Sequence, residues 1–366
     1  MSVSEVGQAL GFSRAEVEDY LDAYLNMPLL ELAAEADRLR SQRHPEGNVS
    51  YIVDRNINYT NVCVTDCTFC AFYRRPKHHE SYTLTYEQIG QKIDEAKGLG
   101  AVQILMQGGH NPYLPLDWYV GLLQHIKESH PIHVHAFSAS EIEIIAKVSK
   151  LSIEETLREL KDAGLDSMPG AGAEILVDSV RDRIAKKKTD TAAWIAIHEA
   201  AHNLGLLTTA TMMYGTGESL EDRLEHVLQL KALQQRTGGF TAFIPWSLQA
   251  QGTEMEGTPP ATGVEYLRMV AMARIVLDNV DNLQVSYVTQ GPKMAQVALR
   301  FGCNDFGSLM IEENVVSATG TDFIMPEPEI RRIIEDAGFT PKPRYQDYTL
   351  VEDDPERARS YGVVFA

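Results

Sequence analysis

Residues 51–76 read YIVDRNINYTNVCVTDCTFCAFYRRP, a strand-like apolar run that leads directly into a loop with three of the four cysteines. Seven further short apolar or β-branched runs follow, at 102–109, 133–137, 165–171, 206–213, 239–246, 283–288 and 306–311. Helical patterns separate several of them, at 85–100, 152–165, 191–205 and 219–239. Strands alternating with helices form parallel sheets, and eight such units close a barrel. The sequence therefore predicts an α/β fold, a (βα)8 TIM-type barrel, with a doubly wound open sheet as the alternative.

The two ends of the chain differ from this repeating pattern. Residues 1–48 carry apolar positions at helical spacing, among them Val17, Leu21 and Tyr24, and predict an N-terminal helical extension that caps the barrel. The barrel itself is assigned to residues 49–338. Residues 339–366 are polar and contain prolines, so we expect a C-terminal extension of irregular structure on the surface.

The charge balance limits the possible partners. The chain has 33 Lys and Arg against 51 Asp and Glu, a formal charge of -18, which repels phosphate backbones and anionic lipid. No stretch reaches the roughly 18 consecutive apolar residues of a membrane span, and the first residues lack the basic and apolar regions of a signal peptide. We therefore expect a cytoplasmic protein that binds neither nucleic acid nor membranes.

The cysteine loop carries the strongest chemical signal. Cys63, Cys67 and Cys70 follow the first strand, at the barrel face where active sites are built, and lie too close together for a disulfide framework. Three thiolates leave one iron of a four-iron four-sulfur cubane open for another ligand. The alternative is structural zinc with His78 or His79 as the fourth ligand, although zinc sites usually combine two separated ligand pairs. Cys303 stands alone, and we expect no role for it in the site.

The Cys-x-x-x-Cys-x-x-Cys motif, with Phe69 before its last cysteine, resembles the signature of radical S-adenosylmethionine (SAM) enzymes. Over residues 50–345 the chain is similar to the cyclic dehypoxanthinyl futalosine synthases of the futalosine route to menaquinone, in MQGGHNP, HVHAFSASEI, GLDSMPGAGAEIL and FIPWSLQ. The resemblance implies a 4Fe-4S cluster on the three cysteines and SAM as cofactors. The residues that it implies at the cofactors are Phe69, Gln107, Gly108, Gly109, Glu174 and Ile244.

The same resemblance implies a reaction. A 5'-deoxyadenosyl radical would abstract the ribose 4-prime hydrogen of dehypoxanthine futalosine, and the substrate would then close a new ring. The expected partners are this small nucleoside-derived substrate and a low-potential electron donor. A base must accept the ring proton, for which His135 and Glu312 are candidates by residue type. Arg74, Arg75 and Arg300 are available for the substrate carboxylate. Radical SAM synthases of the aminofutalosine or deazaflavin type are the alternative.

Several other motifs have two interpretations. Gly108 and Gly109 suit any tight turn after a strand, or would let the backbone approach the methionine amino group of SAM, as in the similar enzymes. Residues 169–174, PGAGAE, lack the third glycine of a dinucleotide fingerprint. Glu174 could favour a helix N-terminus through the dipole, or accept hydrogen bonds from the ribose of SAM. His133 and His135 are two residues apart on a strand and so share a side, which we expect to be the barrel interior, with His135 in contact with substrate.

One motif points to a different function. His198-Glu199-Ala200-Ala201-His202 matches the H-E-x-x-H helix of zinc metalloproteases, but Thr208 stands where the longer pattern has its third histidine. The apolar stripe of this helix is expected to leave both histidines on a flank, facing solvent or a neighbouring helix. A zinc hydrolase and a noncatalytic iron-sulfur or zinc protein thus remain as rival functions.

Overall fold

The computed structural model describes residues 1–321 and 323–351. Seven parallel strands hydrogen-bond in chain order to form a curled sheet, β2 (Asp54–Ile57), β3 (Gln103–Met106), β4 (His133–Ala136), β5 (Ser167–Met168), β6 (Leu207–Tyr214), β7 (Phe240–Ser247) and β8 (Asn282–Leu283). A second parallel sheet has the order β10 (Thr340–Pro343), β1 (Asn48–Ile52), β9 (Asp305–Ser308).

Backbone hydrogen bonds join the two sheets into a ring through β9. On one side the Val285 N–H donates to the Asp305 carbonyl at 3.0 Å. On the other side the Leu309 N–H donates to the Ile52 carbonyl at 2.9 Å and the Ile311 N–H to the Asp54 carbonyl at 3.2 Å. Because β1 and β2 are separated by Val53 alone, β9 closes the ring against β2, and the predicted (βα)8 barrel is confirmed.

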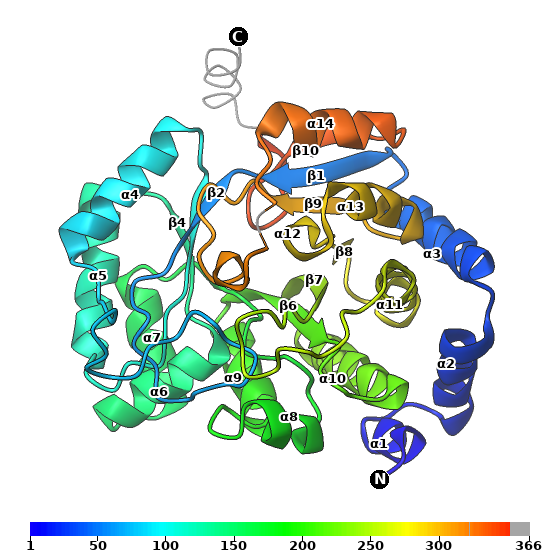
Figure 1. The fold of residues 1–366 in the computed structure, drawn as a ribbon, viewed down its shortest axis with the longest axis horizontal. Coiled ribbons are helices and arrows are strands. Elements are labelled where there is room, and N and C mark those ends of the chain that lie inside the picture. Colours follow the sequence, from blue (N-terminus) through cyan, green and yellow to red (C-terminus); the bar gives the residue numbers. More distant parts are fainter. Residues whose placement is uncertain (322, 352–366) are drawn as a thin grey trace.

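Helices surround these strands (Figure 1). They are α4 (Tyr86–Gly98), α5 (Leu116–Ser129), α6 (Ala139–Ser149), α7 (Ile153–Ala163), α8 (Asp178–Ile184), α9 (Thr191–Asn203), α10 (Leu220–Thr237), α11 (Gly263–Val276), α12 (Tyr287–Gln290), α13 (Pro292–Ala298) and α14 (Glu327–Asp336), with 3-10 turns η1 (Leu299–Phe301) and η2 (Ser317–Thr319). Local chemistry fixes their ends. A capping box starts α4 at Thr85 and Gln88, and Gly238 ends α10 in the left-handed conformation. The four helices expected from the sequence correspond to α4, α7, α9 and α10.

The N-terminal segment forms three helices, α1 (Val3–Ala9), α2 (Arg14–Asn26) and α3 (Leu29–Arg43). They lie along the outside of α10 and α11, as Figure 1 shows. The Tyr24 hydroxyl is 3.3 Å from the sulfur of Met269 in α11, and the Tyr24 side chain is buried there. The N-terminal helical extension therefore packs on the side of the barrel, away from the ends of its strands.

The expectation of irregular surface structure after residue 338 is wrong for part of that segment. Residues 340–343 form β10, which pairs with β1 at the edge of the smaller sheet. An edge strand tolerates Pro341 and Pro343 because it needs hydrogen bonds on one side only. Arg344 then enters the interior, where its side chain is 3% exposed and donates to the Asp305 carboxylate at 2.5 and 2.9 Å. The rest of the predicted extension, residues 352–366, lies outside the described residues.

The two histidines of the H-E-x-x-H motif lie on α9. The prediction that both face outward on a flank is wrong for His198, which is fully buried with its ring 3.9 Å from that of Trp194. The Thr208 hydroxyl on β6 contacts His198 Nδ1 at 3.0 Å and His202 Nε2 at 2.8 Å. Trp194 and His198 therefore belong to the buried face of α9, which packs against β6. Within the described residues, no third His, Cys, Asp or Glu joins these histidines in a group that could hold a metal ion.

The burial of His198 gives a test of its role. His198→Ala should lower the free energy of unfolding by about 2–4 kcal/mol, because the ring fills a packed space beside Trp194. Urea denaturation measures the change, and His79→Ala, at an exposed side chain, is the matched control. An unchanged stability together with loss of a bound zinc would contradict the packing role and revive the hydrolase hypothesis.

Candidate functional site

A cavity of about 380 Å³ opens at the carboxyl ends of the strands and extends into the barrel. Ten of the eleven residues predicted for the site line it, namely Cys63, Cys67, Cys70, Phe69, Gln107, Gly108, Gly109, His135, Glu174 and Ile244. The structure therefore brings together side chains from segments that are far apart in the sequence. The roles of these ten residues toward cofactor and substrate are predictions.

Backbone hydrogen bonds hold the cysteine loop against its neighbours. The Cys63 N–H donates to the Arg74 carbonyl at 2.9 Å, which folds the loop back on itself. The Val64 N–H donates to the His110 carbonyl at 3.2 Å, and the Thr68 N–H to the Ile184 carbonyl at 2.9 Å. These contacts fix the loop to the turn after β3 and to the end of α8. The positions of the thiols thus depend on three separate segments of the chain.

The thiols fit a metal cluster. All three are free, and Cys63 and Cys67 are buried. Burial raises the pKa of Cys67 to about 12 and also raises the pKa of Cys70, so a cation must displace their protons for thiolates to persist there. Among the described residues, neither His78 nor His79 joins them in a group that could hold a single ion. A cubane suits such a set because each thiolate binds a different iron. Cys303 is buried and does not line the cavity.

The two glycines after β3 are required by packing around the cysteine loop. A Cβ at Gly109 would lie 2.3 Å from the Val62 carbonyl oxygen, and one at Gly108 would lie 2.5 Å from the ring of Tyr59. The Gly108 N–H also donates to the buried carboxylate of Glu141 at 2.9 Å. The same Glu141 oxygen accepts from the Tyr59 hydroxyl at 2.7 Å. Glu141 was missed as a cavity residue, although the capping box that it forms with Ser138 could have drawn attention to it.

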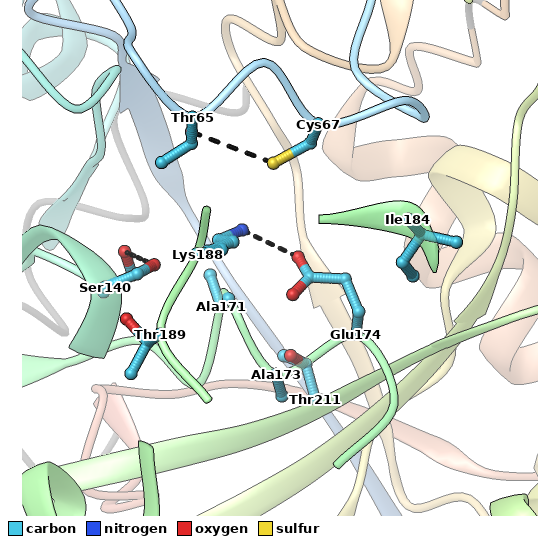
Figure 2. Close-up of polar contacts among 12 residues, drawn as sticks. Thr65, Cys67, Ser140, Ala171, Ala173, Glu174, Ile184, Lys188, Thr189 and Thr211 are labelled. Atoms are coloured by element: carbon cyan, nitrogen blue, oxygen red, sulfur yellow. Dashed lines mark hydrogen bonds and ion pairs between the residues drawn. The ribbon is translucent and has the colours of Figure 1, made fainter. Parts of the chain in front are cut away.

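Glu174 and Lys188 form a buried ion pair below the cysteine loop (Figure 2). The Lys188 ammonium donates to Glu174 Oε1 at 2.8 Å and lies 5.6 Å from the centre of the Phe69 ring. Burial lowers the pKa of Lys188, but the charges of Glu174 and Cys67 outweigh this effect and raise it, so the ammonium stays charged. Glu174 Oε2 is buried and has no hydrogen-bond partner among the described residues. That oxygen lies 3.7 Å from Nη1 of the buried Arg181, which is an ion-pair distance too long for a hydrogen bond, and Glu174 lines the cavity.

The alternative explanation for Glu174, a helix N-terminus, does not match its position. α8 begins at Asp178, and Glu174 precedes it with a positive φ of 40°. Lys188 was missed because it ends the run Lys186-Lys187-Lys188, which has the composition of an exposed segment. The fold turns only its last side chain inward, to 13% exposure.

His135 lies deeper in the same cavity and connects to His133 through one hydroxyl. Ser167 Oγ is 2.7 Å from His135 Nδ1 and 2.7 Å from His133 Nε2, so the two histidines do lie on the same side of β4. Burial lowers the pKa of His135 well below the usual value, so the ring is neutral and weakly basic. A neutral ring nitrogen at the cavity wall can accept a hydrogen bond from a bound group, and a negative charge beside it would make it a stronger base.

Glu312 does not line the cavity, which corrects its expected position. Its carboxylate accepts from Arg55 Nε at 2.7 Å and from Lys92 Nζ at 2.8 Å. Burial alone would raise the pKa of Glu312, but hydrogen bonds from Lys92, Asn314 and Arg55 lower it overall. A carboxylate held by two cations is a poor proton acceptor, so we leave Glu312 out of the proposed catalytic group.

The arginines suggested for a substrate carboxylate also lie elsewhere. Arg74 donates to Glu80 and to the carbonyls of residues 71–73, so it stabilises the loop. Arg75 is exposed, and Arg300 donates to the Ala337 carbonyl. The lysine and arginine side chains that do line the cavity are Lys188 and Arg344. Sequence reasoning also missed Asn56 and Gln103, whose buried side-chain oxygens lack hydrogen-bond partners among the described residues.

Comparison with known proteins agrees with this geometry. Residues 57–230 match the radical SAM superfamily, and residues 237–357 match the CofH/MqnC C-terminal region. The chain is 44% identical over 354 residues to a cyclic dehypoxanthine futalosine synthase of Halalkalibacterium halodurans, which covers 96% of both chains. A synthase of the same name from Streptomyces coelicolor is 43% identical over 95% of this chain and 89% of its own.

Other relatives are named for a different activity. A 5-amino-6-(D-ribitylamino)uracil–L-tyrosine 4-hydroxyphenyl transferase of Archaeoglobus fulgidus is 41% identical over 91% of this chain and 96% of its own. Among solved structures, methylornithine synthase superposes with a TM-score of 0.70 at 17% identity, over 92% of this chain and 97% of that one, which supports the fold. Alignment over most of the length of these relatives, at more than 40% identity, establishes the family to which the chain belongs. The chain belongs to the radical SAM superfamily, within the family that shares the CofH/MqnC C-terminal region.

Proposed function

We propose that this enzyme is a cyclase that converts dehypoxanthine futalosine to cyclic dehypoxanthine futalosine in menaquinone biosynthesis. The observation that carries the proposal is the 44% identity to a synthase of this name over 96% of both chains. The enzymes of this superfamily use a 4Fe-4S cluster and SAM, and the three buried thiols suit that cluster. When bound, these cofactors supply a 5'-deoxyadenosyl radical that abstracts the ribose 4-prime hydrogen of the substrate.

The predicted site residues that line the cavity then have the following proposed tasks. Cys63, Cys67 and Cys70 hold the cluster. Phe69, the backbone of residues 107–109, and Ile244 surround SAM, and Glu174 Oε2, which accepts no hydrogen bond within the described residues, accepts from its ribose hydroxyls. His135 accepts the proton that the substrate loses on ring closure. The enclosing barrel excludes water and stray hydrogen donors from the reacting atoms.

The hydroxyphenyl transferase activity is the second candidate, because a relative with that name is 41% identical over 91% of the chain. Both reactions need an aromatic group and a polyhydroxy chain in one cavity, so the shape of the cavity alone does not separate them. The identity to the cyclases is only slightly higher. A direct comparison of substrates is therefore the decisive experiment.

Reconstituted enzyme should convert dehypoxanthine futalosine, with SAM and a reductant under anaerobic conditions, to a cyclised product that mass spectrometry identifies. The control reaction contains tyrosine and 5-amino-6-(D-ribitylamino)uracil in place of the nucleoside. Turnover of that pair, with none of the nucleoside, would overturn the cyclase proposal in favour of the transferase.

Replacement of Cys63, Cys67 or Cys70 by alanine should abolish cluster assembly, because the cubane loses an obligatory thiolate. Iron and sulfide analysis after anaerobic reconstitution measures this directly. Cys303→Ala is the matched control and should retain its iron, since Cys303 lies outside the cavity. A colourless wild-type protein with stoichiometric zinc at these cysteines would refute the cluster assignment.

Glu174→Gln should weaken SAM binding about 10- to 100-fold, because an amide replaces the anionic acceptor of a charge-assisted hydrogen bond worth roughly 1–3 kcal/mol. Equilibrium dialysis with labelled SAM measures the affinity, and iron content should stay at the wild-type level. The melting temperature also matters, since the same change leaves Lys188 without its anionic partner. Unchanged SAM affinity with a lower melting temperature would assign Glu174 a structural role only.

A further inference from the structure

Two short segments concentrate positive charge in this acidic chain. Residues 74–79 read RRPKHH and residues 183–188 read RIAKKK, so they contain Lys, Arg and His but no Asp or Glu. The chain as a whole has a formal charge of -18. Lys188 points inward to Glu174, and Arg74 stabilises the cysteine loop. The remaining exposed cations, which we call the basic patch, are Arg75, Lys77, Arg183, Lys186 and Lys187.

The two segments lie side by side although they are more than a hundred residues apart. The Thr68 N–H donates to the Ile184 carbonyl at 2.9 Å. Asp66 joins them through its side chain, since its carboxylate accepts from Lys187 Nζ at 2.8 Å and from Arg75 Nη2 at 3.2 Å. The side chains of Arg75 and Lys187 nevertheless remain 72% and 61% exposed. The two segments of the basic patch therefore meet at Asp66.

Some of these cations have no local carboxylate. Within the described residues, Lys77, Arg183 and Lys186 make no ion pair, and Arg183 donates only to the Gly217 carbonyl at 3.2 Å. A cation that stabilised the fold would be paired or buried, whereas these side chains are exposed to solvent. Their charge is thus free to act on an approaching partner, and clustered charges of one sign steer association with the opposite sign.

The basic patch lies on the outer side of the loop whose inner side carries the thiols. Asp66, which binds Arg75 and Lys187, directly precedes Cys67 in the chain. The Arg74 carbonyl, next to Arg75, accepts from the Cys63 N–H at 2.9 Å. Residues of the basic patch and the residues that hold the thiols are thus neighbours in the chain or directly hydrogen-bonded in this loop. A redox group that docks there comes close to the cluster that the three cysteines hold.

We propose that the basic patch is the docking surface of an acidic one-electron carrier protein, which reduces the cluster. The carrier gives up one electron, and the cluster gains it. The proposal rests on the cofactors of the radical SAM superfamily and does not depend on which substrate the cavity takes. The net charge of -18 opposes any anionic partner at long range, so attraction of the carrier is confined to the basic patch.

The test reverses two cations that touch neither Asp66 nor a thiol. In the holoenzyme, Arg183→Glu/Lys186→Glu should raise the Kd for an acidic flavodoxin about 10-fold or more at low salt, and should flatten the dependence of Kd on ionic strength. The matched control is Lys97→Glu/Arg236→Glu, which changes the net charge equally. These exposed side chains lie in the last turns of α4 and α10, each of which leads directly to the next strand, and so lie toward the other end of the barrel. The control should bind flavodoxin as the wild type does.

A second measurement separates docking from damage to the site. SAM cleavage driven by dithionite, a small reductant that needs no docking surface, should be the same in both variants and in the wild type. Cleavage driven by reduced flavodoxin should fall only in the Arg183→Glu/Lys186→Glu variant. Equal flavodoxin affinity in the two variants would overturn the proposal, as would a wild type that binds a DNA oligonucleotide but no flavodoxin. Failure of the cyclase assay alone would leave this result unaffected.

Discussion

The buried ion pair between Asp305 and Arg344 joins the parts of the chain on which barrel closure depends. The Asp305 carboxylate accepts from Arg344 Nε and Nη2 and from the Ser50 hydroxyl on β1. Its backbone carbonyl accepts from Val285, just after β8. One residue therefore connects β8, β9, β1 and the C-terminal segment. Because both side chains are almost fully buried, removal of either partner would leave an unpaired charge in the interior, which typically costs about 3–5 kcal/mol.

Closure at this point also shapes the cavity. Arg344 and Gln346 line its deep end, so the C-terminal segment contributes to the wall opposite the cysteine loop. At the other end, the close approach of Gly109 to the Val62 carbonyl lets the cysteine loop lie directly on the turn after β3. The Asp305–Arg344 ion pair and the close approach of Gly109 to Val62 thus each join residues that are remote in sequence at the edges of the cavity. His135 and the thiols line the same cavity, the histidine from β4 and the thiols from the loop after β2.

The sequence was sufficient for the barrel and for the residues with specific motifs. Eight strand-like runs corresponded to eight strands because parallel strands covered by helices are apolar throughout. The cysteines, glycines and Glu174 share one cavity because all follow strands at the same barrel face. Lys188 and Arg344 could not be found in this way, because burial of a charge depends on a partner from another segment. Glu312 was misplaced for the same reason, since Arg55 and Lys92 hold it outside the cavity.

Positive charge gathers around the cysteine loop on two sides, and the two sides differ in solvation. Lys188, inside, is shielded from water, so its charge acts strongly on whatever anion the cavity holds. The exposed cations outside act through water and salt, which weaken each contact and limit its reach to about 10 Å. An inner charge of this kind suits a tightly held ligand, and an outer group of charges suits a partner that must dissociate after each electron. Both groups of charges lie beside the loop that carries the three thiols, Lys188 through Glu174 and the outer cations through Asp66.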